Sequence, residues 1–180
     1  MTAPPTAPIE ALTAEAAQAE LSALAALLED AVASGASIGF LPPLGPAEAA
    51  DYWTTVVASV RAGTRVLLAA RDADGAVVGS VQVDLESRPN GRHRAEVMKV
   101  MVHRRARRRG LGHALMAAAE EHARRLGRTT LFLDTRLGDP AERLYRAQGW
   151  TFAGSIPRYA RSAGGALDAN AIYYKLLGPA

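Results

Sequence analysis

Apolar residues recur at helical spacing in four segments of this chain. In the first segment Leu21, Leu24, Leu27 and Val32 lie three to five residues apart, which places them on one face of a helix. A glycine follows each segment, as expected where a helix ends in a left-handed residue. The pattern predicts helices over residues 12–32, 46–61, 110–126 and 140–148.

Alternating and continuous apolar runs predict strands around these helices. In one of them Val81 and Val83 alternate with Gln82 and Asp84, so the two sets face opposite sides of a sheet. Residues 157–169 are glycine-rich and polar, and we expect a loop there. The predicted strands are residues 64–71, 76–85, 96–102, 129–134, 150–155 and 171–177.

This order of elements predicts one α/β domain over residues 1–180. Two helices, three strands, a helix, a strand, a helix and two strands suit a mixed, mostly antiparallel central sheet with helices on both faces. We expect residues 9–63 to form the N-terminal helices and residues 64–177 the sheet core. Residues 1–8 contain three prolines, which indicates a disordered tail.

Composition narrows the class of protein. Of 180 residues, 49% are hydrophobic, which is enough for a packed core, and the net charge is +3. The chain has no cysteine, which excludes disulfides, thiolate metal sites and a cysteine nucleophile. The spacing of the four histidines shows no metal pattern. Neither a membrane span nor a signal peptide is evident, so we expect a cytoplasmic protein.

The positive charge gathers in one short turn, from Arg104 to Arg109. An apolar strand precedes this turn, and a helix that begins near Gly110 follows it. The unpaired amides at a helix start attract anions, and glycines let a ligand approach the backbone. The arrangement predicts a pyrophosphate site. It is not a P-loop, because His113 and Ala114 stand where Lys and Ser or Thr are needed. A dinucleotide fold would need a third glycine where Leu115 stands.

What remains is the pattern Arg107-x-x-Gly110-x-Gly112 after a strand that ends in Val-x-Val. A second motif, Ala141-x-x-Leu-Tyr145 followed by Gly149-Trp150, comes after one helix and one strand. Together the two motifs resemble the GCN5-related N-acetyltransferase (GNAT) family over residues 64–177. The chain departs from the family at Gly138, where many members have Asn, and at Arg108, where many have Gly.

Within the family, the chain resembles most the branch of the tabtoxin resistance protein. The matching stretches are Phe40-Leu-Pro-Pro-Leu44, Leu133-Asp-Thr-Arg136 with Gly138-Asp139, Ile156-Pro157 with Tyr159-Ala160, and Tyr173-Tyr-Lys175. This resemblance implies a GNAT-like fold and an acetyl-CoA-dependent enzyme that acetylates a primary amine of a small molecule, with antibiotic or toxin resistance as one role.

The resemblance also assigns site residues. It implies that acetyl-CoA lies along the strand and the turn, on Val100, Met101, Val102, Arg107, Arg108, Arg109, Gly110, Leu111, Gly112, His113 and Tyr145. Tyr145 is the expected acid, and the alternative is a packed core tyrosine. Glu96 and Asp134 are the expected bases. Asp134 could instead cap a helix or pair with Arg136 or Lys99, and Glu96 could pair with His93 or Arg94.

We expect the acceptor side to be built from the N-terminal helices, the loop at Phe40 and the loop around Tyr159. The candidate acceptor residues are Phe40, Trp53, Gln82, Asp84 and Tyr159. Transfer should be direct, because no residue offers itself as an acyl carrier. The expected partners are acetyl-CoA and a small amine, with no nucleic acid and no membrane, and the protein is a monomer or homodimer.

Two other functions stay open at this point. The Arg104–Arg109 cluster could serve a nucleic-acid-binding module, although interleaved aromatic residues and a helix-turn-helix are missing. A catalytically silent CoA-binding protein is the other alternative, against which Tyr145 and the two carboxylates argue.

Overall fold

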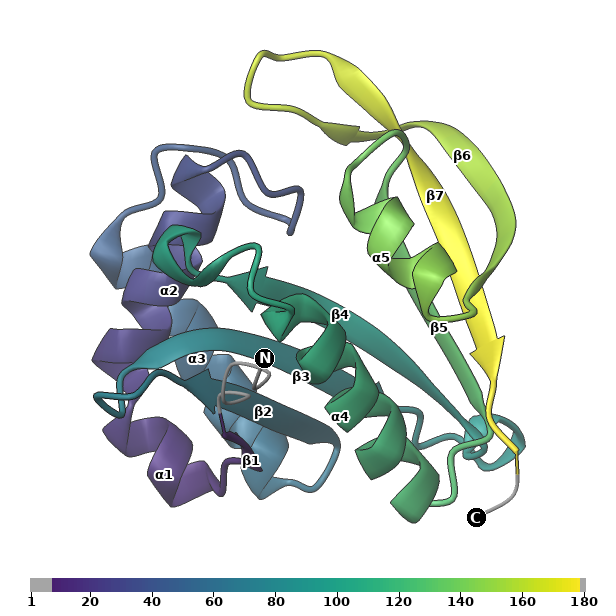
Figure 1. Cartoon of the computed structure of the whole chain (residues 1–180), viewed down its shortest axis with the longest axis horizontal. Helices are drawn as coiled ribbons and strands as arrows, with labels where there is room; N and C mark the ends of the chain where they lie inside the picture. The colour runs from purple at the N-terminus through teal and green to yellow at the C-terminus, as the bar shows by residue number, and fades with distance from the viewer. Residues whose placement is uncertain (1–7, 179–180) are drawn as a thin grey trace, which may run out of the picture.

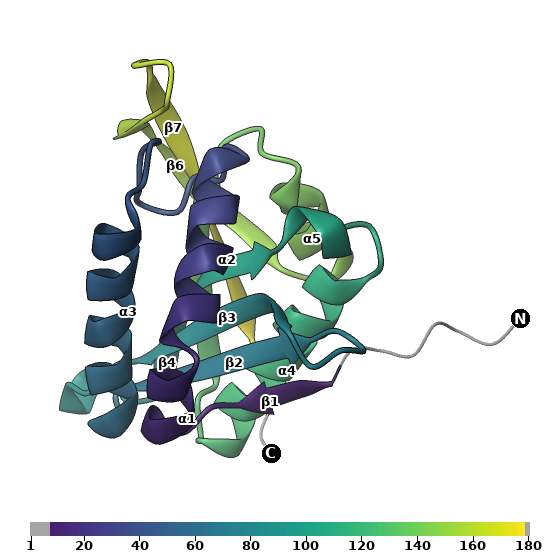
Figure 2. The same cartoon turned by 90° about the vertical axis from the view of Figure 1, so that its left-hand side faces the viewer.

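The centre of the molecule is a seven-stranded sheet with helices on both faces (Figures 1 and 2). The structure is a computed structural model that describes residues 8–178. The strand order is β1-β2-β3-β4-β5-β7-β6, and every neighbouring pair is antiparallel except β4 and β5. This arrangement confirms the predicted fold class. The strands are β1 (Ile9–Ala11), β2 (Arg65–Arg71), β3 (Val77–Leu85), β4 (Arg94–Val102), β5 (Thr130–Arg136), β6 (Thr151–Arg161) and β7 (Leu167–Leu176).

The helices divide between the two faces. One face of β2–β4 is covered by α1 to α3, and the other by α4 (Figure 2), while α5 lies beside β5 and β7 (Figure 1). None of the helices within residues 8–178 has the length and apolarity needed to cross a bilayer. The helices are α1 (Ala14–Ala19), α2 (Leu21–Ala33), α3 (Pro46–Arg61), α4 (Leu111–Arg125) and α5 (Ala141–Ala147).

Strands β2 and β3 are buried on both faces of the sheet, which gives the protein two hydrophobic cores. Along β2, Leu67 and Ala69 pack against the N-terminal helices, whereas Leu68 and Ala70 pack on the side of α4. All four side chains are fully buried. Because side chains alternate along a strand, the continuous apolar run of β2 supplies both cores.

The N-terminal region differs from the prediction in two ways. Residues 9–11 form an edge strand on β2, where helices were expected, and the predicted helix over residues 12–32 is divided into α1 and α2 at Glu20. Glu20 is a good helix former, so no local signal marks the break. Its carboxylate pairs with Arg71 at 2.9 Å, a partner that only the folded chain brings close. Residues 1–7 of the predicted tail lie outside the described residues.

The last two strands are longer than predicted. The segment 157–169, expected as a loop, instead extends β6 and β7 into a hairpin whose turn begins at Ser162. The hairpin projects beyond the rest of the sheet (Figure 1). Its polar residues carry no apolar periodicity, and the register shifts between Ile156 and Ala160. Tyr159 therefore lies on a strand.

Glu120 links α4 to β7 and to the residue before β6. It is 8% exposed, and its carboxylate accepts hydrogen bonds from the Trp150 indole N–H at 2.9 Å and from the Lys175 ammonium at 2.6 Å. Trp150 belongs to the second sequence motif, so this interaction fixes the end of that motif against α4. The sequence indicated the aromatic residue but not its buried acidic partner.

Glu120→Ala should lower the free energy of unfolding by roughly 3 kcal/mol, because it leaves the buried Trp150 indole N–H without an acceptor and the Lys175 ammonium without its carboxylate. The neighbouring Glu121 pairs with Arg124 and Arg125 at the exposed surface. Glu121→Ala is therefore the control, with an expected loss below about 0.5 kcal/mol. Urea denaturation of the two variants measures both values. Equal losses would contradict a structural role of the buried carboxylate.

Candidate active site

Strands β4 and β5 pair at one end and diverge at the other (Figure 1). Their parallel pairing joins Arg94–Glu96 to Thr130–Phe132 and ends there. Beyond this point β4 stays paired with β3, and β5 stays paired with β7. The edge of β4 that faces β5 therefore has free backbone groups from Val97 onward within the described chain, which can pair with a ligand that carries amides.

A bulge in β4 adds to the divergence. Ser80 lies opposite Met101 and Gln82 lies opposite Met98, so two residues of β4 face the single residue between Ser80 and Gln82. Lys99, one of the two, has a φ of 53°, which is unusual for a residue with a side chain. Bulges bend a strand and redirect its side chains. Here the bulge sets the direction of Lys99.

The turn after β4 opens onto the start of α4. Gly110 is the N-cap with a φ of 78°, and it provides no side-chain cap. The amides of Leu111, Gly112 and His113 donate to no acceptor within residues 8–178, and the first helical bond runs from the Ala114 amide to the Gly110 carbonyl. Three free amides and the positive end of a 15-residue helix suit an anion, as the sequence predicted.

The backbone has a positive φ at both positions where the chain departs from the family pattern. Gly138 has a φ of 83°, a region that Asn also tolerates better than most residues do. Arg108 has a φ of 61°, a conformation that glycine adopts without strain. The backbone shape at both positions thus suits the residue that many family members have there.

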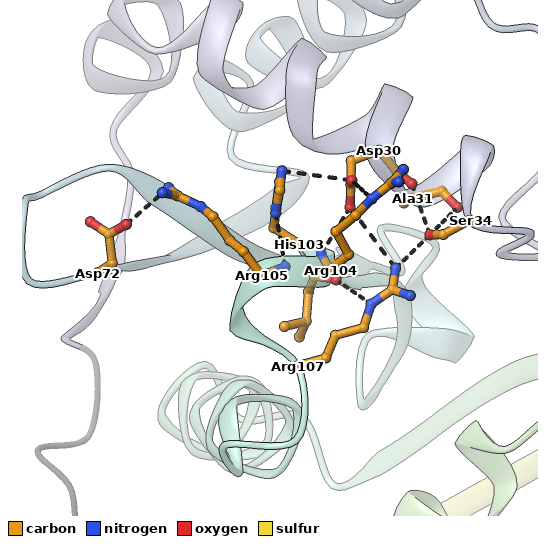
Figure 3. Close-up of polar contacts among 9 residues, drawn as sticks. Asp30, Ala31, Ser34, Asp72, His103, Arg104, Arg105 and Arg107 are labelled. Atoms are coloured by element: carbon orange, nitrogen blue, oxygen red, sulfur yellow. Dashed lines mark hydrogen bonds and ion pairs between the residues drawn. The ribbon is translucent and has the colours of Figure 1, made fainter.

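The arginine cluster is largely occupied by partners within the protein (Figure 3). Arg104 pairs with Asp30, and Arg105 pairs with Asp72 at 2.9 Å. Arg107 donates to the Val102 carbonyl at 2.9 Å and to the Ser34 hydroxyl at 2.5 Å. Three arginines therefore fasten the turn to α2 and to the β2–β3 hairpin. These contacts distinguish three members of the Arg104–Arg109 cluster from Arg108 and Arg109.

Asp30 is the centre of these contacts. Burial raises its pKa, but hydrogen bonds from the backbone and the guanidinium of Arg104 outweigh burial, so the pKa lies below its usual value. Asp30 is therefore a carboxylate at neutral pH. Arg108 and Arg109 are the members of the cluster that have no ion pair among the described residues.

A cleft of about 310 Å³ occupies the space between the diverging strands. It brings together Glu96 of β4, Asp134 of β5, Tyr145 of α5 and Tyr159 of β6. The loop before α3 closes one side. The remaining lining residues are Ala36, Ser37, Ile38, Gly39, Val97, Met98, Lys99, Val100, Thr135, Arg136, Asp139, Ala141, Ala160, Asp168, Ala169 and Asn170.

Tyr145 is held at the cleft by α5. The helix begins at Ala141, one residue after the predicted start at Pro140. The Asp139 carboxylate accepts from the Ala141 amide at 2.9 Å, and Glu142 accepts from the Gly138 amide at 2.6 Å. The Tyr145 ring packs against Trp150 and Tyr173. Its hydroxyl donates no hydrogen bond to the described part of the protein. Burial raises the Tyr145 pKa above its usual value, and Asp139 and Asp134 raise it further, so the hydroxyl keeps its proton at neutral pH.

The two candidate bases have no cationic partner within 4 Å in residues 8–178. Arg136 pairs with Asp139 instead of Asp134, and Arg94 pairs with Glu86 instead of Glu96. The Asp134 carboxylate accepts from the Asn170 amide at 3.3 Å. Burial raises the pKa of Glu96, and the negative charges of Asp134 and Asp84 raise it further. Glu96 is therefore a stronger base than an exposed glutamate.

Only part of the predicted acceptor set reaches the cleft. Tyr159 lines it, and Phe40 lines an adjoining pocket of about 440 Å³. Trp53 and Gln82 are fully buried under the N-terminal helices, so neither lines the cleft. Gln82 accepts from Tyr52 at 3.2 Å, because the alternation of β3 points it toward α3.

Two other predicted site residues, Asp84 and Met101, also lie outside the cleft. Asp84 forms an ion pair with Arg65 at 2.7 Å and lines a separate pocket beside Glu96. The Met101 side chain is 2% exposed in the core beneath the N-terminal helices, which leaves its backbone as the group that a ligand can reach.

Sequence reasoning missed Lys99, Asn170 and the segment 36–39 as cleft residues. One signal for Lys99 was present, because Lys99 and Lys175 are the two lysines among 21 basic residues. Asn170 carried no local signal, since it lies between the predicted loop over residues 157–169 and the predicted strand over residues 171–177.

The family model of the Acetyltransferase (GNAT) family matches residues 38–150, more than half of the chain. The chain belongs to this family. It is an acyltransferase, and acetyl-CoA is its acetyl donor. The resemblance to the tabtoxin-resistance branch stays a prediction.

Solved structures share the fold over nearly the whole chain. A ribosomal-protein-alanine N-acetyltransferase from Brucella melitensis is 26% identical with a TM-score of 0.79, over 94% of this chain and 99% of that one. yncA, a putative acetyltransferase from Salmonella typhimurium with its cofactor acetyl-CoA, is 20% identical with a TM-score of 0.78, over 96% and 95%. A phosphinothricin acetyltransferase from Sinorhizobium meliloti, in complex with AcCoA, is 22% identical with a TM-score of 0.79, over 96% and 89%.

Gly110→Val and Gly112→Val should each abolish CoA binding in calorimetry. Valine at Gly110 is strained at a φ of 78° and crowds the free amides, and a Cβ at Gly112 would lie 3.3 Å from Leu144. Gly127, at the other end of α4, has a φ of 71° with open space around it. Gly127→Val is the control, because it carries similar strain but should keep CoA affinity. Full CoA affinity in both turn variants would contradict the assignment.

Proposed function

We propose that this acetyltransferase transfers an acetyl group directly to a primary amine of a small molecule. The observation that carries the proposal is the cleft, where Glu96, Asp134 and Tyr145 line a single space of about 310 Å³. That volume is at the low end of the range for small-molecule sites. Candidate bases and a protonated candidate acid thus face the same volume, which is what amine acetylation requires.

Acetyl-CoA supplies an acetyl group activated as a thioester. The residues that suit this donor are the free amides of Leu111–His113 for the pyrophosphate, and the free backbone of Val100 with the Val102 N–H for the pantetheine amides. Arg108 and Arg109 add charge beside them, whereas Arg107 holds the end of β4 in place through the Val102 carbonyl.

Glu96 takes the proton from the acceptor ammonium, directly or through water, and Asp134 assists from β5. The raised pKa of Glu96 suits this task, because a base is most effective when its pKa approaches the working pH. Tyr145 gives its proton to the departing sulfur. No cysteine is present to carry an acyl group, which supports direct transfer.

The remaining details of the proposal follow from the same site. The protein acts in the cytoplasm, as a monomer or homodimer, without nucleic acid. The partners found for Arg104, Arg105 and Arg107 support the last point, because paired arginines are less available to a phosphate backbone. Resistance to an amine-bearing antibiotic or toxin is one use of this activity, which the resemblance to the tabtoxin-resistance branch supports.

Tyr145→Phe should lower kcat by about 10²-fold or more, the scale of general acid catalysis, with little change in CoA affinity. It removes one hydroxyl and almost no volume, so folding should survive. Tyr174→Phe, on the exposed side of β7, is the control and should keep the wild-type kcat. Thiol release measures both variants. A kcat within about threefold of wild type would return Tyr145 to a packing role.

The pH profile tests the base. Glu96 must be ionised to accept a proton, and its pKa is raised. The kcat/KM of the wild type should therefore fall as pH decreases through a value above the usual range of a glutamate. Glu96→Gln should lose activity near neutral pH, lack this acidic limb and recover as rising pH deprotonates the acceptor itself.

Asp134→Asn is the second arm of this test, and Glu121→Gln on the exposed surface is the control. The variant that changes the fall of kcat/KM at low pH, Glu96→Gln or Asp134→Asn, identifies the base. If both cleft variants keep the wild-type profile, the amine enters already neutral and the two carboxylates serve the structure only.

A further inference from the structure

Lys99 places an unpaired ammonium inside the cleft. The bulge of β4 turns its side chain into the space that Glu96, Asp134 and Tyr145 also line. No carboxylate within residues 8–178 lies within 4 Å of the Lys99 ammonium. The other cleft cation, Arg136, is bound to Asp139 at 3.2 Å and lies 3.9 Å from Asp168. Lys99 is thus the cleft cation left for a ligand.

The use of lysine at this position is informative. The described residues place Lys175 at Glu120, where a compact cation sits between a carboxylate and the Gln148 carbonyl at 2.6 and 2.7 Å. Elsewhere the chain uses arginine. The space around the Lys99 ammonium is narrow, because a Cβ at Gly39 would lie 3.3 Å from its nitrogen. The loop before α3 comes too close for a planar guanidinium to replace the ammonium easily.

Charges of both signs act on Lys99. Burial lowers the Lys99 pKa and outweighs the carboxylates of Asp134 and Glu96, which raise it; Arg65 lowers it further, so the pKa lies below its usual value. Each of these charges is near enough to act, yet none forms a direct pair with the ammonium. Since a buried charge is stabilised by a partner at contact distance, an anionic group of a ligand at Lys99 would provide what the protein does not.

The cleft therefore offers carboxylates for a cation and an ammonium for an anion. We propose that the acceptor is a small amine that also carries a carboxylate, such as an amino acid, and that Lys99 binds this carboxylate while the amine faces Glu96 and Asp134. The proposal rests on the proposed amine acetylation and adds the class of acceptor. Lys99 is here a specificity-determining residue that contacts the part of the acceptor that does not react.

Matched acceptors test this assignment. We would measure kcat/KM by thiol release for the common amino acids other than cysteine and proline, each beside its own carboxamide, which keeps the primary amine and removes the negative charge of the α-carboxylate. The wild type should prefer the acid by tenfold or more, the scale of one charge-assisted hydrogen bond. Lys99→Met should remove this preference by slowing the acids alone. A Lys99→Met variant that slows acids and carboxamides equally would overturn the proposal, since that outcome indicates a structural role.

A binding measurement separates this proposal from the acetylation chemistry. Biosynthetic labelling with ¹³Cε-lysine reports on the two lysines without enlarging them, and Lys99→Met identifies the Lys99 signal. In the CoA-bound protein, free amino acids should shift the Lys99 signal, and their carboxamides should not. The Lys175 signal is the internal control, because Glu120 and Gln148 already hold that ammonium.

The outcomes are distinct. If no amine is acetylated but the Lys99 signal responds to the acids, the proposed function fails and the anion site stands. If amines are acetylated and the Lys99 signal does not respond to any acid, the function stands and the anion site is wrong. A response to acids and carboxamides alike would also overturn the assignment.

Discussion

Strands β4 and β5 hydrogen-bond over three residues and then diverge, because each one follows a different antiparallel partner. The other parts of the site depend on this divergence. It frees one edge of β4 for a ligand with amides, and it opens the cleft in which Glu96 and Asp134 meet. A sheet paired along its full length would close this space with backbone hydrogen bonds. The bulge at Lys99 directs into the cleft an ammonium that has no ion pair within residues 8–178.

Some arginines of the turn form contacts within the protein, and others have no ion pair within residues 8–178. Arg104, Arg105 and Arg107 hold the turn before α4 through Asp30, Asp72, Ser34 and the end of β4. This leaves the free helix amides, with Arg108 and Arg109, to meet an anion. A turn that is rigid before ligand arrives loses less conformational entropy on binding. The clustered arginines that raise the net charge therefore also fix the shape of the turn before α4.

The buried acidic residues Glu142 and Glu120 hold α5 and β7 in position beside the cleft. Glu142 accepts from the Gly138 amide and from the Tyr173 hydroxyl, and Arg146 donates to the same hydroxyl at 2.9 Å. Hydrogen bonds from Tyr173 lower the Glu142 pKa despite burial, so this carboxylate is ionised at neutral pH. Together with Glu120 on α4, it fixes the helix that carries Tyr145. A candidate catalytic hydroxyl that has no hydrogen-bond partner within residues 8–178 depends on such rigid support.

The sequence by itself determined the elements and the family. Apolar periodicity and glycine stops are local signals, so they predicted most helices and strands, and short motifs predicted the turn at Gly110 and the helix of Tyr145. The tertiary structure decided what depends on distant partners. The break at Glu20, the edge strand at Ile9, the length of the last hairpin and the occupation of the arginines all depend on contacts across the fold. The direction of Lys99 depends on one bulge and on the loop at Gly39, and no local pattern encodes either one.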